Sequence, residues 1–337
     1  MSTLRVACAG AGYFSQFHYD AWARIAGVDI VGSLDRDISS AAATGHPPFD
    51  SLSAMLSQTH PHLLDIVTPP ATHMAFIKGA LDHGVKAIIC QKPFCTSLDE
   101  ARRASTLCEA NETVLVVHEN FRFQPWYRCI RKAIDEKLLG DVHQLTFRLR
   151  TGDGQGDNAY LDRQPYFQEM PRLLIHETGV HWIDTFRYLL GEPLAVYADL
   201  RRINPVIAGE DAGYVLFEFE RGMRALFDGN RHLDHAADDH RLTLGECLVE
   251  GTEGTLSLLG NGCLQHRRFG ETRATELLAA RQWKGFAGDC VFALQQHVIN
   301  ALRDGTELEN RAADYLRVLE IEEAVYRSAE QRCRILL

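Results

Sequence analysis

The stretch RVACAGAGYFS, residues 5–15, decides the fold of this 337-residue chain. A short apolar run leads at once into Gly10-Ala11-Gly12-Tyr13-Phe14-Ser15, a G-x-G-x-x-S pattern that opens a helical stretch. A strand that turns sharply into a helix needs Gly10 for the turn, and Gly12 lets the backbone approach a pyrophosphate at the helix N-terminus. The small Ser15 replaces the third glycine and still permits close packing. The pattern predicts a dinucleotide-binding turn; taken alone, it also fits a plain glycine turn.

The rest of the first 120 residues alternates apolar, β-branched runs with longer helical stretches. We expect strands near residues 5–9, 28–34, 64–68, 87–90 and 114–118. We expect helices over residues 14–25, 71–82 and 98–110, the last opened by a capping box of Ser97 and Glu100. This order predicts an α/β fold whose N-terminal part is a doubly wound parallel sheet of the Rossmann type.

Beyond residue 142 the pattern changes. Residues 144–150, 196–203, 214–219 and 223–228 alternate apolar and polar side chains, as half-buried antiparallel strands do. We therefore expect a Rossmann domain over residues 1–123 and an α+β domain with a largely antiparallel open sheet over residues 124–337. Three glycines between Gly152 and Gly156 predict a loop that closes over the site.

Composition limits the function classes. Residues 1–10 contain no signal peptide, and no run of about eighteen apolar residues occurs, which argues against a secreted or membrane protein. Nine cysteines without a C-x-x-C pair indicate reduced thiols, so we expect a cytoplasmic protein. A net charge of -10 argues against nucleic acid as a partner and favours a small molecule.

Asp35 ends the second predicted strand, at about the distance from the glycines where a ribose-binding acid is expected. Its carboxylate would hold the ribose hydroxyls and repel a 2′-phosphate, so we expect NAD rather than NADP. The adjacent Arg36 would stack on adenine or grip that phosphate, or it is a solvated surface charge.

Lys92 stands at the carboxyl end of the fourth predicted strand, in Gln91-Lys92-Pro93-Phe94. Open α/β sheets bind ligands at this edge, so Lys92 is a candidate donor to a substrate oxygen. The alternative is an exposed lysine paired with a carboxylate.

The second cluster runs from His176 to Asp184. If it is helical from Glu177, then Glu177, His181 and Asp184 share one face. An imidazole suits proton transfer near neutral pH, and a neighbouring carboxylate would set its tautomer. The alternative is a core histidine satisfied by Asp184. His232, His235 and His240 lie among aspartates but match no zinc spacing, so we expect no metal.

These motifs together resemble the Gfo/Idh/MocA family, named for glucose-fructose oxidoreductase and inositol 2-dehydrogenase. The resemblance rests on the glycine turn, the x-K-P strand end, the acid-x-G-x-H-x-x-Asp run, Val67-Thr68-Pro69-Pro70 with His73, and the closing helical segment 312–330. Residues 117–124, 150–152 and 164–167, with the QKPF motif, resemble the branch that includes D-apiose dehydrogenase.

The resemblance implies a dehydrogenase that oxidises a sugar or polyol hydroxyl with NAD, with Lys92, His181 and Glu177 as catalytic residues. Implied cofactor contacts are Gly10, Gly12, Tyr13, Phe14, Asp35, Arg36, Thr68, Pro69, His73, Gln91, Lys92 and Asn120. Implied substrate contacts are Lys92, Asn120, Arg122, Tyr166, Glu177 and His181. For Asn120 and Arg122 the alternative is packing between the domains. The second domain would cover the substrate and associate into a homodimer or homotetramer.

Two positions depart from the family pattern. Gln91 stands where the family usually has Glu, so Lys92 loses a charge partner, and Glu177 stands where it usually has Asp, one methylene shorter. His181 would accept the hydroxyl proton while Lys92 stabilises the alkoxide; the sequence leaves open which of the two is the immediate base. Two other functions remain: an NAD-dependent glycosidase of the same family, and a non-catalytic sugar or cofactor sensor.

Overall fold

A computed structural model describes residues 3–337, which form two compact units. The first contains residues 3–120 and Cys290–Arg317, and the second contains Phe121–Asp289 and Val318–Leu337. The first segment of the first unit therefore ends three residues before the predicted boundary. This unit also includes Cys290–Arg317, which we had assigned to the second domain.

The first unit is built on a parallel sheet with the strand order β3-β2-β1-β4-β5-β6. The strands are β1 Leu4–Ala9, β2 Val28–Leu34, β3 Pro48–Phe49, β4 Leu63–Ile66, β5 Ala87–Gln91 and β6 Val114–His118. The connecting helices are α1 Ser15–Arg24, α2 Ile38–Ala43, α3 Leu52–Thr59, α4 His73–Asp82 and α5 Leu98–Ala110. Short apolar strands such as β4 are buried along their whole length because helices cover both faces of such a sheet. The predicted Rossmann fold is confirmed; β3, α2 and α3 were not predicted.

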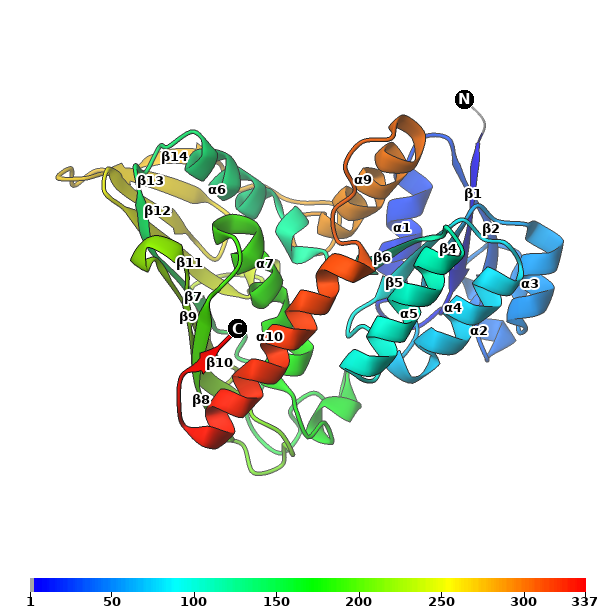
Figure 1. Cartoon of the computed structure of the whole chain (residues 1–337), viewed down its shortest axis with the longest axis horizontal. Coiled ribbons are helices and arrows are strands. Elements are labelled where there is room, and N and C mark those ends of the chain that lie inside the picture. The colour runs from blue at the N-terminus through cyan, green and yellow to red at the C-terminus, as the bar shows by residue number, and fades with distance from the viewer. Residues whose placement is uncertain (1–2) are drawn as a thin grey trace. The chain divides into compact units, whose positions relative to one another are not determined.

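Helix α9, Cys290–Asp304, explains why the first unit includes a late segment of the chain. It lies beside α1 (Figure 1). The guanidinium of Arg24 in α1 lies over the ring of Phe292 at 4.5 Å. Gln295 reaches Asp65 in β4, with Nε2 3.4 Å from Oδ2. The helix covers α1 and the centre of the sheet.

The second unit contains a nine-stranded sheet with the order β14-β13-β12-β11-β7-β10-β9-β8-β15. Its strands are β7 Val142–Leu149, β8 Ala195–Arg201, β9 Ala212–Glu218, β10 Arg224–Asn230, β11 Gly245–Gly251, β12 Gly254–Leu258, β13 Leu264–Arg268, β14 Thr275–Leu278 and β15 Ile335–Leu336. Only β7 and β10 pair in parallel, so the predicted, largely antiparallel sheet is confirmed.

Helices cover one face of this second sheet. They are α6 Pro125–Asp135, α7 Val180–Leu190 and α10 Ala312–Gln331, whose residues from Val318 group with this unit; the short α8, His240–Thr243, precedes β11. Trp182 of α7 stacks on Phe147 of β7 with ring centroids 4.1 Å apart and lies 5.6 Å from Phe227 of β10. These aromatic rings form the core between α7 and the sheet.

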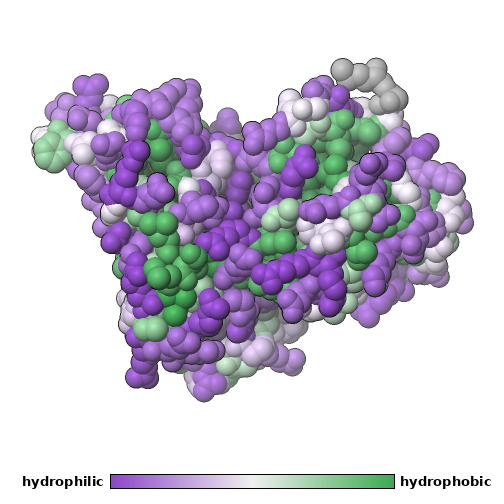
Figure 2. Space-filling view, in the orientation of Figure 1, coloured by the Kyte–Doolittle hydropathy of each residue, from purple (hydrophilic) through white to green (hydrophobic). Residues whose placement is uncertain are grey.

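Within residues 3–337, no helix combines the length and apolar character that crossing a bilayer requires. Hydrophilic residues border the apolar areas on the face shown in Figure 2. All nine cysteines are free thiols, and all except Cys129 and Cys333 are buried.

Candidate functional site

The glycine turn after β1 has the geometry that a dinucleotide site needs. Gly10 has φ +109°, and a Cβ there would lie 2.2 Å from the carbonyl oxygen of Val67, so only glycine fits. A Cβ on Gly12 would meet no atom within 4 Å, so the backbone there is open to a ligand. Ser15 closes the turn, its hydroxyl donating to the Gly12 carbonyl at 2.6 Å.

Asp35, just beyond β2, lies against this turn. Its Oδ2 accepts from the Ala11 amide at 2.9 Å and its Oδ1 accepts from the Asp37 amide at 3.0 Å. Arg36 is exposed, as is Tyr13 at 46%. Phe14 packs edge-on against His18 with centroids 5.7 Å apart. An open glycine backbone beside a fixed carboxylate fits the pyrophosphate and ribose of NAD.

The β4–α4 turn carries the next predicted cofactor contacts. Thr68 and Thr72 share a hydroxyl hydrogen bond of 2.7 Å, and Pro69 is exposed. His73 is fully buried: its Nε2 donates to the Thr68 carbonyl at 2.8 Å and its Nδ1 accepts from the Cys95 amide at 3.3 Å. Burial lowers the pKa of His73 to about 4. His73 is thus a neutral link between this turn and the segment after Lys92.

Lys92 directly follows β5 and is half-buried. Its backbone N–H donates to Oε1 of Gln91 at 2.8 Å, and the Lys92–Pro93 peptide is cis. Gln91 Nε2 lies 3.2 Å from Nε2 of His18 in α1. The strand end that carries Lys92 is therefore tied to the helix that follows the glycine turn. Asn120, at the end of the first segment of this unit, is buried and donates to Cys290 Sγ at 3.1 Å.

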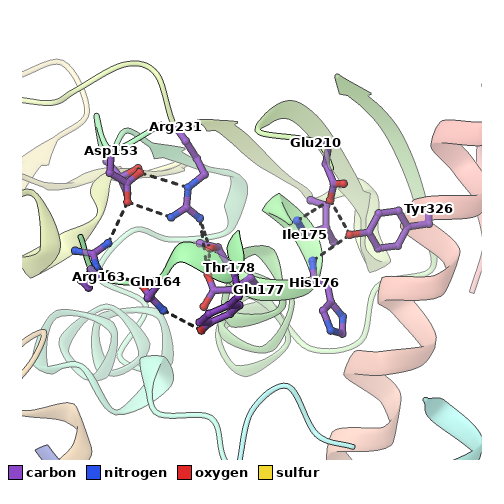
Figure 3. A network of polar contacts seen from close by, with 12 residues as sticks. Asp153, Arg163, Gln164, Ile175, His176, Glu177, Thr178, Glu210, Arg231 and Tyr326 are labelled. Carbon is purple, nitrogen blue, oxygen red and sulfur yellow. Dashed lines mark hydrogen bonds and ion pairs between the residues drawn. The ribbon is translucent and has the colours of Figure 1, made fainter. Parts of the chain in front are cut away.

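In the second unit, a π-helical turn, Leu174–Gly179, precedes α7 and carries Glu177. The shared face of Glu177, His181 and Asp184 depended on an α-helix from Glu177, whereas the α-helix begins at Val180. The wider turn is held from outside (Figure 3): Glu210 Oε1 accepts from the Ile175 amide at 3.1 Å, and the Tyr326 hydroxyl accepts from the His176 amide at 3.1 Å. Tyr326 also donates to Glu210 at 2.6 Å. Such turns recur at functional sites.

Glu177 lies beside a buried arginine that the sequence reading missed. Its Oε2 accepts from the Thr178 hydroxyl at 2.5 Å and lies 3.8 Å from Nη1 of Arg231 (Figure 3). Arg231 donates from Nη1 to Thr178 at 2.7 Å and from Nη2 to Asp153 at 3.1 Å. Burial works against the charge of Asp153, yet the guanidinium of Arg231 lowers the pKa of that carboxyl. The site thus contains, beside Glu177, an ion pair between the buried Arg231 and the partly buried Asp153.

Tyr166 belongs to a 3-10 turn, Pro165–Gln168, and is 55% exposed. Gln164 donates to its hydroxyl at 3.1 Å. Partial burial, followed by the negative charge of Glu177, raises the pKa of Tyr166. The structure therefore brings together Tyr166 and Glu177, two of the predicted substrate contacts.

His181 in α7 is 5% exposed. Its ring stacks on Phe121, which lies in the 3-10 turn η2, Phe121–Phe123. Asp184 receives two hydrogen bonds from Arg122, from Nε at 2.8 Å and from Nη2 at 2.6 Å. Both carboxylate oxygens of Asp184 therefore bind Arg122, and this pair links η2 to α7.

The loop from Gly152 to Gly156 is anchored rather than free. The amides of Gly152 and Gly154 each donate to a backbone carbonyl at 2.9 Å, and Asn204 Nδ2 donates to the carbonyls of Gly154 and Gly156 at 2.8 Å. These bonds argue against the predicted lid. The loop instead presents Asp153 to Arg231.

The histidine-rich segment has other partners. His232 Nε2 lies 2.8 Å from Asp211, and His235 Nδ1 lies 2.7 Å from the Arg150 carbonyl. In the part of the chain that the structure describes, no three His, Cys, Asp or Glu side chains are grouped to hold a metal ion.

Comparisons with known proteins agree with the folds of the two units. Residues 4–119 match the oxidoreductase family with an NAD-binding Rossmann fold, and residues 127–257 match the GFO/IDH/MocA C-terminal domain. D-apiose dehydrogenase of Paraburkholderia graminis is 32% identical over 96% of this chain and 87% of its own length. D-apiose dehydrogenase of Rhizobium rhizogenes is 29% identical over 98% of this chain and 96% of its own length.

Among solved structures, an oxidoreductase from Agrobacterium radiobacter in complex with NAD+, L-tartaric acid and magnesium has a TM-score of 0.87 and 27% identity. The match covers 99% of this chain and 98% of that one. Both units of the present chain are therefore found together in one known protein.

Proposed function

The chain belongs to the Gfo/Idh/MocA family of NAD-binding sugar and polyol oxidoreductases, and we propose that its substrate is D-apiose or a closely related aldose, oxidised to the lactone. The support for this sugar is the similarity to two D-apiose dehydrogenases over nearly the whole chain. The full length of the match matters because the proposed substrate contacts Tyr166, Glu177 and His181 belong to the second unit.

The observation that best supports the proposal is the pair of hydrogen bonds that links the strand end of Lys92 to the helix after the glycine turn. The Gln91 side chain holds the Lys92 amide and contacts His18 in the helix that begins after Gly12. A lysine at the carboxyl end of a parallel strand, next to the dinucleotide turn, is placed to reach a substrate beside a nicotinamide ring. Gly10, Gly12, Asp35 and the Thr68–Pro69 turn would hold the cofactor.

In the proposed mechanism, Lys92 and His181 act on the same hydroxyl. Bound NAD supplies the hydride acceptor. His181 takes the hydroxyl proton, and the ammonium of Lys92 stabilises the negative charge that develops on the oxygen. If the sugar is a cyclic hemiacetal, loss of hydride from the anomeric carbon and of the proton from its hydroxyl leaves a lactone.

Substrate recognition would involve Glu177 and Tyr166, with Asn120 and Arg122 as further contacts. The half-buried carboxylate of Glu177, fixed by Thr178 and Arg231, is a strong acceptor for sugar hydroxyls. Arg122 already binds Asp184, so its contact with the sugar would use donors outside that pair.

We also propose a homodimer or homotetramer. Tyr197 and Tyr214 are each 43% exposed on neighbouring strands β8 and β9, where Asp199 pairs with Tyr214. Aromatic side chains on an open sheet face suit a subunit interface. Light scattering coupled to gel filtration measures the mass, and a monomer contradicts this part of the proposal.

The test of the function is a substrate screen. Purified protein is mixed with NAD or NADP and with free aldoses including D-apiose, inositols and aryl glycosides, while absorbance of the reduced cofactor is followed. We expect reduced cofactor with D-apiose or a related aldose. Hydrolysis of an aryl glycoside without net reduction would instead indicate a glycosidase. Binding of sugar and NAD without any turnover would indicate a sensor.

A further inference from the structure

A fully buried carboxylate lies in the middle of β4. Asp65 Oδ2 is 2.7 Å from Nε1 of Trp22, 2.8 Å from Nδ1 of His18 and 3.4 Å from Nε2 of Gln295. An indole N–H and an amide NH₂ can only donate, so this oxygen is an acceptor. The contact with His18 is therefore an Nδ1–H that donates to Asp65. A buried carboxylate is tolerated when it is hydrogen-bonded in this way.

The other ring nitrogen of His18 faces Gln91. The backbone N–H of Lys92 donates to Gln91 Oε1 at 2.8 Å, and this bond fixes which end of the amide is oxygen. The NH₂ end then lies 3.2 Å from His18 Nε2. Because NH₂ donates and does not accept, His18 Nε2 has to present its lone pair. The contacts of Nδ1 with Asp65 and of Nε2 with Gln91 require the same tautomer, so His18 is the neutral ring with its hydrogen on Nδ1.

We propose that Asp65 and His18 are positioning residues for Lys92. Asp65 sets the tautomer of His18, His18 holds the amide of Gln91, and Gln91 holds the backbone N–H of Lys92 where the chain leaves β5. The inference rests on the proposed function in giving Lys92 its catalytic role. It also accounts for Gln91, because a carboxylate at this position would place a second acceptor against the His18 lone pair.

Two further rings fix the plane of His18. His118 at the end of β6 lies over it with centroids 4.1 Å apart, and Phe14 meets it edge-on at 5.7 Å. His18 itself is fully buried. A ring held on its faces and at both nitrogens has one orientation, which is what a positioning residue needs.

The first test reads the tautomer directly. Long-range ¹H–¹⁵N correlation spectra of the whole protein with ¹⁵N-labelled histidine distinguish Nδ1–H from Nε2–H rings, and the His18→Asn variant identifies the signal. We expect the Nδ1–H tautomer in the wild-type protein and a doubly protonated ring in Gln91→Glu. A wild-type Nε2–H tautomer or imidazolium overturns the inference.

The second test asks whether the hydrogen bonds that run from Asp65 through His18 and Gln91 hold Lys92 in place. In His18→Asn we expect loss of hydrogen-exchange protection at the Lys92 amide, a fall in kcat of about tenfold or more, and an NAD affinity changed by less than about twofold. Thr113→Val is the control, since it removes another buried hydrogen bond, from Thr113 to the Val85 carbonyl. It should leave kcat and the Lys92 amide unchanged.

The outcomes separate the two claims. Retained protection at Lys92, or a kcat within about threefold of the wild-type value in His18→Asn, overturns the positioning role. If none of the tested sugars supports reduction of NAD by the wild-type protein, the proposed function fails. The tautomer and amide measurements still decide whether the series of hydrogen bonds from Asp65 to Lys92 exists.

Discussion

The imidazole of His181 lies flat on the ring of Phe121, with centroids 3.7 Å apart and planes 3° apart. Phe121 is itself buried and meets Trp182 edge-on at 5.3 Å. Stacking fixes the plane of the imidazole through its face, and so fixes the plane in which both ring nitrogens lie. We expect this contact to aim the proposed proton acceptor at the substrate hydroxyl.

Replacing Phe121 with Leu should therefore lower kcat by about tenfold while the affinity for NAD stays the same, because misdirected acid–base groups slow the chemical step. Steady-state rates with the sugar identified in the screen and NAD measure this. Phe123→Leu is the matched control, since Phe123 is also buried in η2 but packs under Arg128 at 4.2 Å. Equal losses in both variants would mean that the effect is general to η2.

Arg231 should be the most costly charge to remove. Arg231→Met leaves the partly buried carboxylate of Asp153 without its main cation and Thr178 without its donor, and losing such charge-assisted hydrogen bonds costs about 1.5–3 kcal/mol. Urea unfolding measures the change in the free energy of unfolding. Arg172→Met breaks the exposed pair with Glu323 and should cost less than about 1 kcal/mol. Similar losses in the two variants would contradict a structural role for the pair of Arg231 and Asp153.

Burial of His73 predicts a pH dependence of stability. The pKa of His73 is about 4 in the folded protein, whereas the ordinary value for histidine is 6.5. Between pH 4 and pH 6.5 the His73 ring therefore binds a proton in the unfolded chain and not in the folded one. Stability is therefore fully present above pH 6.5 and falls as the pH drops toward 4, by up to about 3 kcal/mol from this group.

The His73→Gln variant isolates this term, because its amide still donates to the Thr68 carbonyl but does not titrate. Urea unfolding of both proteins at a series of pH values gives the difference. We expect the variant to lose less stability than the wild-type protein over this range. Parallel curves would show that His73 is not the group responsible.

Asp35 should decide the choice of cofactor. Replacing it with Ser removes the charge that repels a 2′-phosphate, so the ratio of kcat/KM for NAD to that for NADP should fall by about tenfold or more. Asp29→Asn is the control, since Asp29 is exposed on β2, the strand that Asp35 directly follows. An unchanged ratio in Asp35→Ser would assign the preference to another residue.

The sequence predicted those parts of the fold that are encoded locally. Apolar runs, glycine at the turn and the Ser97 cap each depend on neighbours within a few residues, and Ser97 does accept from the Glu100 amide. By contrast, the contact between Gln295 and Asp65 joins positions far apart in the chain. No local pattern indicates that α9 returns to the first unit.

The same distinction applies to the site. Lys92, His181 and Glu177 were predicted from motifs, whereas Arg231 lies just after β10 and far from Glu177 in sequence. The π-helical turn was missed because its residues have ordinary helical spacing and the turn depends on Glu210 and Tyr326, which lie outside it. An arginine directly after a strand of alternating pattern was the available signal in the sequence.

The central claim is that Lys92 and His181 act together on one hydroxyl, and the most direct measurement is the rate of cofactor reduction on mixing NAD-loaded enzyme with sugar. We predict that Lys92→Met and His181→Asn each slow this rate by about a hundredfold or more with NAD affinity retained, and that the double variant is little slower than the worse single one, because groups that serve one step are not additive. Near-normal rates in either single variant, or losses that multiply in the double variant, would contradict it.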